Sequence, residues 1–159
     1  VGDAFAVALL ERKGFTKEDF AKSHPGGSLG KQLLLSIGDI MHTDEEIPVV
    51  CSDDSLSTGL IEMSQKALGM TAVVDKDSQL AGIFTDGDLR RTLESNIDIK
   101  ATKMSDVMTA NPFVLSEDTL AYNAVNLIQE KKITSVIVTK ENKVIGALNI
   151  HDLFRAGLM

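Results

Sequence analysis

Residues 82–91 read GIFTDGDLRR, and residues 146–155 read GALNIHDLFR. In each stretch a glycine begins a short apolar run, which predicts a buried strand, and a polar residue then begins an amphipathic segment, which predicts a helix. The two stretches share four identical residues at a constant offset of 64 positions, one of them the leucine at 89 and 153. The other matched pairs are Gly82 and Gly146, Asp88 and Asp152, and Arg91 and Arg155. This match indicates that the chain holds two copies of one folding unit.

Other stretches repeat in the same order along the chain. They are SDDSL at 52–56 with SEDTL at 116–120, and GDIM at 38–41 with SDVM at 105–108. Each copy contains an extended piece, a helix over 54–67 or 118–131 that Ser52 or Ser116 is expected to cap, two β-rich runs joined by a polar turn, and a final helix. One such unit leaves a sheet face uncovered. We therefore expect an α/β fold of the α+β type, in which two β-α-β-β-α repeats pack face to face with pseudo-twofold symmetry.

Composition narrows the possible functions. The net charge of −7 argues against nucleic-acid binding, which needs a positive face. No run approaches 18 apolar residues, so we expect a soluble, cytoplasmic protein without a membrane span. The lone Cys51 cannot form an internal disulfide, which fits a reducing compartment. The three histidines, at positions 24, 42 and 151, are far apart in sequence and have no metal-ligand spacing, so no metal site is expected.

The repeated motifs, in their order, resemble the cystathionine-β-synthase-type (CBS) domain, and two in tandem resemble a CBS pair, or Bateman module. The preceding segment, with GDAFAVALLERKGF at 2–15, resembles the C-terminal end of a sugar-isomerase (SIS) domain. Together they resemble the arabinose 5-phosphate isomerase family. This resemblance implies a truncated SIS helix and linker at 1–36, a first CBS repeat at 37–98 and a second at 99–159. It also implies that the chain is a fragment of a larger enzyme.

The stretch SHPGGSLGKQ at 23–32 contains a histidine, a proline, three glycines and a lysine, a composition typical of a loop that binds phosphate or takes part in catalysis. It fails the phosphate-loop pattern, because no glycine stands five residues before Gly30 and Gln32 follows Lys31. From the residues alone it is a Pro/Gly linker. The family resemblance implies instead that His24 is catalytic in aldose–ketose isomerisation. Its partners would belong to the missing domain, so we expect His24 to be idle here.

The CBS resemblance implies a nucleotide site at the G-h-x-[TS]-x-x-D motif, which Gly82, Thr85 and Asp88 match. Free N–H groups at the helix start would face a phosphate, Thr85 could donate its hydroxyl, and Asp88 could accept from ribose hydroxyls. The competing interpretation stays open: Thr85 and Asp88 also form a capping box that needs no ligand. The expected nucleotide-binding residues are Thr85, Asp86, Gly87, Asp88, Ile47, Val49, Met70 and Thr71.

The second copy departs from this pattern, because Asn149 replaces the threonine and His151 replaces the glycine. Asparagine caps a helix well but has no hydroxyl to offer a phosphate. A weaker second site is therefore expected, at Asn149, His151, Asp152 and Thr134. Changing Thr85 and Asp88 to alanine is expected to abolish nucleotide binding and to leave the fold intact.

The family resemblance implies a regulatory module rather than a catalytic one. Its parent enzyme would interconvert ribulose 5-phosphate and arabinose 5-phosphate for Kdo and lipopolysaccharide biosynthesis. The effector would be a nucleotide or a nucleotide sugar, with CMP-Kdo suggested by the pathway, and no cofactor is required. The partners implied are its own SIS domain and further copies, as a CBS-pair dimer in a tetrameric parent. The alternatives are a purely structural dimerisation module and, least favoured, an enzyme in its own right.

Overall fold

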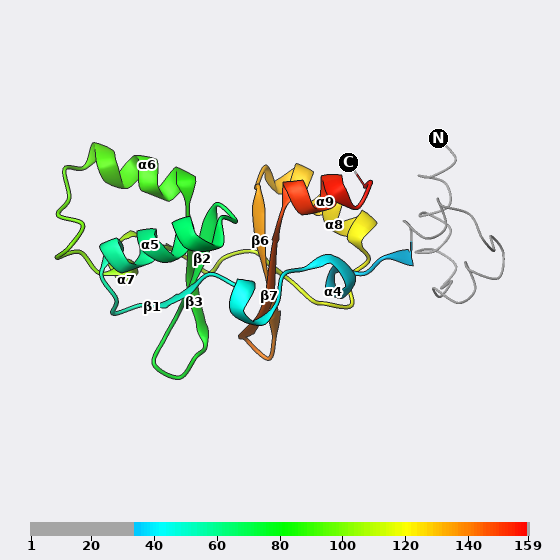
Figure 1. Cartoon of the computed structure of the whole chain (residues 1–159), viewed down its shortest axis with the longest axis horizontal. Helices are drawn as coiled ribbons and strands as arrows, with labels where there is room; N and C mark the ends of the chain where they lie inside the picture. The colour runs from blue at the N-terminus through cyan, green and yellow to red at the C-terminus, as the bar shows by residue number, and fades with distance from the viewer. Residues whose placement is uncertain (1–33, 159) are drawn as a thin grey trace.

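The computed structural model of the chain describes residues 34–158, which form two similar units side by side (Figure 1). The elements of the first repeat are α4 (Ile37–Ile40), the 3-10 helix η1 (Asp44–Glu46), β1 (Val49–Cys51), α5 (Leu56–Lys66), β2 (Met70–Val74), β3 (Leu80–Thr85) and α6 (Asp86–Glu94). Those of the second repeat are α7 (Met104–Val107), β4 (Thr109–Ala110), β5 (Val114–Leu115), α8 (Ala121–Lys131), β6 (Ser135–Lys140), β7 (Lys143–Asn149) and α9 (Ile150–Arg155).

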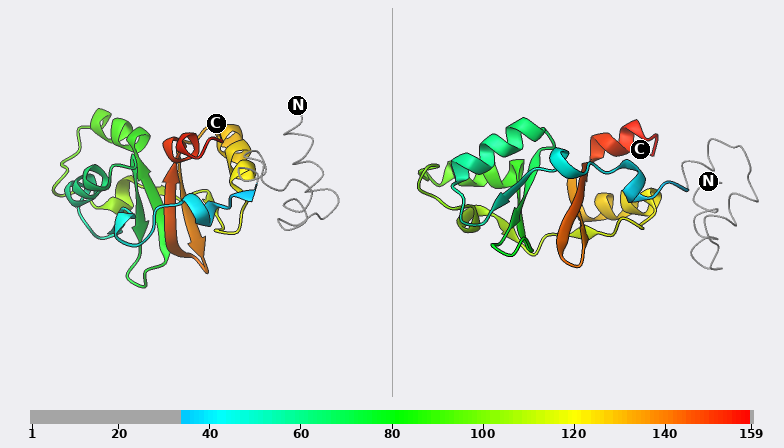
Figure 2. Two further views of the ribbon diagram at one scale, coloured as in Figure 1. Left: turned by 45° about the vertical axis from the view of Figure 1, so that its right-hand side comes forward. Right: turned by 60° about the horizontal axis from the view of Figure 1, so that its bottom comes forward.

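Each repeat builds its sheet in the same way. Strand β1 pairs in parallel with β2, which pairs antiparallel with β3, and β5, β6 and β7 pair likewise. All five residues of β2 are buried, because its sheet has helices on one face and the other repeat on the opposite face. The views in Figure 2 show α5 and α6 outside one sheet and α8 and α9 outside the other. The predicted α/β class and the β-α-β-β-α order are confirmed.

The long helix of each repeat begins later than the sequence pattern predicts. Helix α5 starts at Leu56, and its N-cap is Ser55, whose hydroxyl accepts the N–H of Thr58 at 3.2 Å. Ser52 lies in the turn directly after β1, where its N–H donates to the carbonyl of Val74 at 2.8 Å. Helix α8 starts at Ala121, and its N-cap, Leu120, makes no side-chain capping hydrogen bond. The prediction that Ser52 and Ser116 cap these helices is therefore wrong, because the chain needs a full turn between strand and helix.

The two repeats exchange their opening helices. Ile37 of α4 is completely buried in the core of the second repeat, together with Leu115 and Leu148. Met104 of α7 is completely buried in the core of the first repeat, against Leu56. Figure 1 shows α4 beside β7 and α7 beside α5. The division at 37–98 and 99–159 is therefore a division of the sequence, and each packing unit borrows the first helix of the other repeat.

Two straps carry this exchange. We call residues 41–48, which lead from α4 to β1, the first strap, and residues 108–113, which lead from α7 to β5, the second strap. The second strap contains β4, which joins the sheet of the first repeat by pairing antiparallel with β3. In the first strap, the backbone of His42 exchanges two hydrogen bonds with Ala147 of β7, at 2.8 and 3.1 Å. Each strap thus fastens its repeat to the other.

A shared apolar layer joins the sheets between the straps. It contains seven buried side chains, which are Ile47, Leu68, Met70, Ala72, Ile83, Ile137 and Ala147. At one end of this layer the hairpin turns meet, where the N–H of Leu80 donates to the carbonyl of Asn142 at 2.9 Å. None of the helices described between residues 34 and 158 has the length and apolar character needed to cross a membrane.

Candidate functional site

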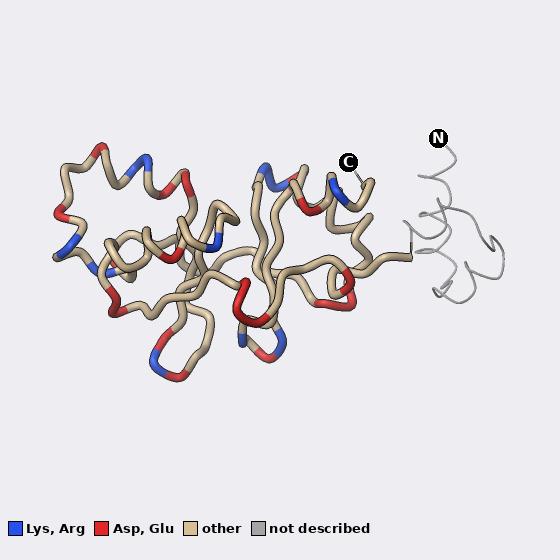
Figure 3. The backbone as a smooth tube through the Cα atoms, in the orientation of Figure 1, with Lys and Arg blue, Asp and Glu red and all other residues tan. Residues whose placement is uncertain are grey.

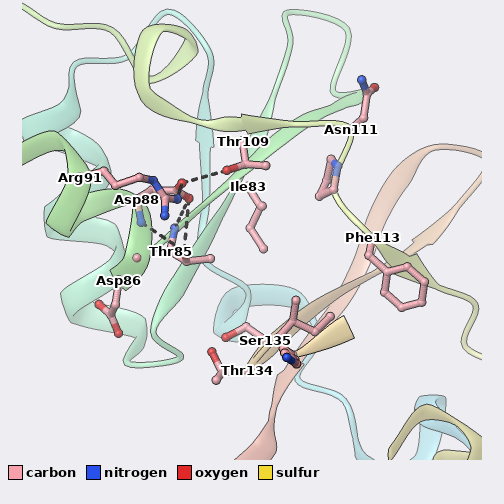
Figure 4. Close-up of a pocket in the computed structure, with 14 residues that line it drawn as sticks. Ile83, Thr85, Asp86, Asp88, Arg91, Thr109, Asn111, Phe113, Thr134 and Ser135 are labelled. Atoms are coloured by element: carbon pink, nitrogen blue, oxygen red, sulfur yellow. Dashed lines mark hydrogen bonds and ion pairs between the residues drawn. The ribbon is translucent and has the colours of Figure 1, made fainter. Parts of the chain in front are cut away.

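The start of α6 is organised around one buried carboxylate. Asp88 is 4% exposed, and its Oδ2 accepts the N–H of Thr85 at 2.9 Å, while the N–H of Asp88 donates to the Thr85 hydroxyl at 3.5 Å. The other oxygen, Oδ1, accepts a hydrogen bond from the hydroxyl of Thr109 in the second strap at 2.8 Å. The same oxygen forms an ion pair with Arg91 (Figure 4). The predicted capping box is present. Asp88 is therefore satisfied by the protein itself, without a ligand.

A cavity of about 470 Å³ opens beside this carboxylate. The first repeat lines it with Ile83, Thr85, Asp86, Gly87, Asp88 and Arg91, and the second repeat lines it with Thr109, Asn111, Pro112, Phe113, Lys132, Ile133, Thr134 and Ser135. Its size falls within the usual range for small-molecule sites, about 300–1,000 Å³. The cavity belongs to neither repeat alone, since the second strap and the start of β6 form the wall opposite α6.

The lining groups have complementary chemistry. Arg91 and Lys132 supply positive charge, and the first N–H groups of α6 have no partners within the helix, so an anion is favoured at the helix start. Ile83 and Phe113 supply an apolar wall, and the ammonium of Lys131 lies 5.7 Å from the Phe113 ring centroid. A planar, partly apolar ligand that carries a phosphate fits this combination.

The start of α9 repeats the arrangement with different residues. Oδ2 of Asp152 accepts the N–H of Asn149 at 2.8 Å, and the N–H of Asp152 donates to the Asn149 side chain at 3.2 Å. Arg155 pairs with Asp152 as Arg91 pairs with Asp88. The position that Thr109 takes at Asp88 is taken here by His42, whose Nε2 lies 2.8 Å from Oδ1 of Asp152.

Three of the four residues of the predicted second site line another cavity, of about 360 Å³. They are Asn149, His151 and Thr134, joined there by Leu68 and Gly69 from the first repeat. The amide of Asn149 already donates to the carbonyl of Leu68 at 3.4 Å. Thr134, Ser135 and Asp86 line both cavities, so the two cavities adjoin each other.

The other four residues predicted to bind the nucleotide, Ile47, Val49, Met70 and Thr71, lie elsewhere. Met70 and Thr71 are completely buried in the sheet, Ile47 belongs to the apolar layer between the repeats, and Val49 packs against that layer. None of the four lines the cavity at Thr85. The exchange of straps explains the difference, because it brings Phe113 and Thr134 of the second repeat to the α6 of the first. The repeat pattern pairs equivalent residues but does not say which copy faces which helix.

His42 has an unusual electrostatic environment. Its Nδ1 lies 3.0 Å from the Glu46 carboxylate, and its Nε2 contacts Asp152. Burial of His42 by itself lowers the pKa of the imidazole, but the hydrogen bonds and charges of Asp152 and Glu46 outweigh burial and raise that pKa above its usual value of 6.5. From its place in the sequence, His42 is a candidate only for metal binding. Within residues 34–158, no three or more His, Cys, Asp or Glu side chains are placed to hold a metal ion.

The predicted catalytic residue His24 lies outside the described residues. Residues 37–95 and 104–158 match the family described as "CBS domain". The chain belongs to the CBS domain family. Two CBS domains in one chain make it a CBS pair.

Curated relatives of this CBS pair carry an enzyme name. The chain is 48% identical over its full length to the arabinose 5-phosphate isomerase KdsD of Yersinia pestis, and 49% identical to those of Pseudomonas aeruginosa and Escherichia coli. It spans 48% to 49% of the length of these relatives. The CBS pair is thus homologous to about half of each KdsD protein.

Solved structures support the same fold. The CBS pair superposes on CBSX2 in complex with AMP with a TM-score of 0.66 and 27% identity, over 78% of this chain and 96% of that one. It also resembles the CBS pair of MJ0100 in complex with 5'-methylthioadenosine and S-adenosyl-L-methionine, with a TM-score of 0.67, 21% identity and coverage of 76% and 93%. At that identity the second likeness supports the fold alone.

Proposed function

We propose that this chain is the effector-binding CBS pair of an arabinose 5-phosphate isomerase, and that it holds a nucleotide or nucleotide sugar in the cavity beside Thr85 and Asp88. The observation that carries the proposal is the lining of that cavity. The start of α6, Arg91 and Lys132 lie on the same cavity as Phe113 and Ile83, so one ligand can meet both an anion site and an apolar wall.

The proposed pose follows from the distribution of charge. The phosphate lies at the start of α6, over Gly87, where a side chain would reduce the space in front of Arg91. The base lies against Phe113 and Ile83. Asp88 is already occupied by three protein groups, so it positions Thr109 and Arg91, and the exposed Asp86 accepts the ribose hydroxyls instead. This assignment differs from the sequence-based one, in which Asp88 itself accepts from ribose.

Homology suggests which enzyme the CBS pair belongs to and which class of effector it binds. The relatives named above are isomerases, and CBSX2 has been crystallised with AMP. We extend this to a parent enzyme that interconverts ribulose 5-phosphate and arabinose 5-phosphate, with CMP-Kdo as a candidate end-product effector. A ligand that contacts both repeats favours one relative placement of them, and this shift biases an attached SIS domain.

Thermal-shift and calorimetric titration of the full chain test the proposal. AMP, CMP and CMP-Kdo are the probes, and a ligand at about 100 times its Kd stabilises the fold by about 2.7 kcal/mol. Phe113→Ala is expected to weaken binding by removing the apolar wall. Tyr122→Ala, which removes an aromatic residue that does not line the cavity, is the matched control. Absence of binding by all three probes at millimolar concentration would contradict the proposal.

A structural module is the second candidate, and two observations favour it. Asp88 needs no ligand, and three large apolar side chains on the outer helices, Ile61, Leu93 and Phe154, are more than half exposed. In that case the helices pack against another copy and the CBS pair only holds SIS domains together. Sedimentation analysis of the full chain distinguishes the two candidates, since a ligand-free dimer without any thermal shift supports the structural role.

A further inference from the structure

The two straps are fastened by different chemistry. Met41 and Met108 are equivalent residues of the repeated GDIM and SDVM motifs, and each is followed by the residue that contacts the capping aspartate of the other repeat. In the second strap this residue is Thr109, which donates a hydroxyl to Asp88. In the first strap it is His42, which contacts Asp152. A hydroxyl does not titrate near neutral pH, whereas an imidazole does.

Both ring nitrogens of His42 face carboxylates. Glu46 of η1 lies at Nδ1, and Asp152 of α9 lies at Nε2, at 3.0 and 2.8 Å. An ionised carboxylate only accepts hydrogen bonds, and a neutral imidazole has one donor and one acceptor nitrogen. Only the doubly protonated imidazolium can therefore donate to both partners. The hydrogen-bond geometry thus selects the charged form of His42.

The surrounding charges act in the same direction. Figure 3 shows the acidic residues of η1 as one continuous red stretch between the two units. The side chain of Asp152 is 5% exposed, and Arg155 is the cation paired with it. From β7, the third element in contact, the backbone of Ala147 pairs with the backbone of His42. Within residues 34–158, two carboxylates thus face the ring directly, Arg155 reaches it through Asp152, and Lys66 contacts the backbone carbonyl of Glu45 in η1.

We propose that His42 is a protonation-dependent latch that fastens the first strap to the second repeat. While the ring is doubly protonated, it ties Glu46 and Asp152 together across the strap. Loss of one ring proton leaves one carboxylate without its donor and removes the attraction, so the strap loosens. The first strap directly follows α4, and α4 directly follows residues 1–36. The latch therefore controls how firmly α4 and the first strap are held against the rest of the CBS pair.

The raised pKa of His42 sets the direction of the effect. The contribution of the latch to stability is fully present below the unfolded-state pKa of about 6.5, and it is lost as the pH rises through the folded-state pKa. The second strap, which Thr109 holds, is expected to show no such change. The two straps therefore serve as test and internal reference within one molecule.

An NMR titration of the full chain tests the latch. The His42 ring resonances, assigned with His42→Gln, are expected to titrate above the ordinary value of about 6.5. Glu46→Gln, at an exposed residue, is expected to lower that pKa. Glu45→Gln removes a neighbouring charge from the same turn and is expected to lower it less, because the Glu45 carboxylate does not contact the ring. A pKa at or below the ordinary value, or equal effects of the two variants, would overturn the proposal.

Hydrogen exchange tests whether the first strap loosens when His42 loses a ring proton. After correction for the intrinsic exchange rate, the amides of His42 and Ala147 are expected to lose protection as the pH rises above about 6.5, whereas those of β4 keep theirs. In Glu46→Gln this loss is expected to be smaller. If the two straps changed in parallel, His42 would not be acting as a latch.

Discussion

Met108 of the second strap lies against Gly82 of β3. A Cβ atom added to Gly82 would lie 2.6 Å from the sulfur of Met108 and 2.7 Å from the carbonyl oxygen of Thr109. The same relationship recurs between Met41 and Gly146, where a Cβ atom would lie 2.9 Å from Cγ of Met41. The glycine of each repeated motif thus makes room for the methionine of the other repeat, and this contact holds the exchanged straps in place.

Alanine at the two glycines is expected to have unequal effects. Gly82→Ala meets the backbone carbonyl of Thr109, which cannot move without disturbing β4, and should lower the free energy of unfolding by about 1–3 kcal/mol. Gly146→Ala meets only the flexible Met41 side chain and should cost less. Urea denaturation of the two variants provides the comparison. A larger loss for Gly146→Ala would contradict the packing described for the straps.

Asp88→Ala is expected to destabilise the fold as well as the site. It leaves the Thr85 N–H and the Thr109 hydroxyl without their buried acceptor, which costs about 1–3 kcal/mol. The structure thus argues against the expectation that alanine at this position leaves the fold intact. Asp86→Ala, at the exposed neighbour, should change stability by less than about 0.5 kcal/mol. Thermal unfolding monitored by circular dichroism measures both, and similar losses would contradict the role of Asp88.

Lys132 is expected to contribute charge to nucleotide binding. It lines the cavity at the end of α8, so Lys132→Gln should weaken the affinity for AMP or CMP by about 1 kcal/mol, or about fivefold, and reduce its salt dependence. Lys140→Gln removes an equal charge at a residue outside the cavity and should leave the affinity nearly unchanged. Isothermal titration at two salt concentrations makes the measurement. Equal losses would indicate a general charge effect.

Replacing His42 by threonine is expected to remove a pH dependence. The variant copies the chemistry of Thr109, and a threonine hydroxyl can still reach a carboxylate without titrating. Because the pKa of His42 is raised, the wild-type chain should exceed His42→Thr in stability most below about pH 6.5, and the difference should shrink as the pH rises. Urea denaturation across this range measures the difference. A difference that grows with pH would contradict the sign of the effect.

The chain by itself is expected to show no isomerase activity. It is homologous to only about half of each KdsD relative, and the proposed catalytic partners of His24 would lie in the other half. An assay of ribulose 5-phosphate and arabinose 5-phosphate interconversion, with full-length KdsD of Escherichia coli as positive control, gives the answer. Isomerase activity that copurifies with the chain would contradict the proposal that the catalytic partners lie in the other half of KdsD.

Much of the fold could be predicted from local patterns. The repeated GIFTDGDLRR and GALNIHDLFR stretches predicted a strand that ends at a capped helix, and both capping boxes are present. Such features depend on residues within a few positions of each other, so the order of amino acids contains them directly. The starts of α5 and α8 were predicted too early, because the turn after each strand leaves no hydrophobic signal.

Only one side of the candidate site could be predicted from the sequence. Thr85, Asp86, Gly87 and Asp88 line the cavity as consecutive residues of one motif, but the wall opposite them comes from Phe113 and Lys132 of the other repeat. In a tandem repeat, each helix start has two equivalent straps that could face it, and local sequence does not choose between them. That choice depends on burying Ile37 and Met104 in the opposite cores.

The amino-acid sequence by itself determined the two repeats, the order of their strands and helices, and the caps at Thr85 and Asn149, because these follow from short-range periodicity and hydrogen bonding. The tertiary structure alone decided the exchange of straps, the far wall of the cavity and the contact of His42 with Asp152. Those two residues are 110 positions apart, and only the packing of one repeat against the other brings them within hydrogen-bond distance.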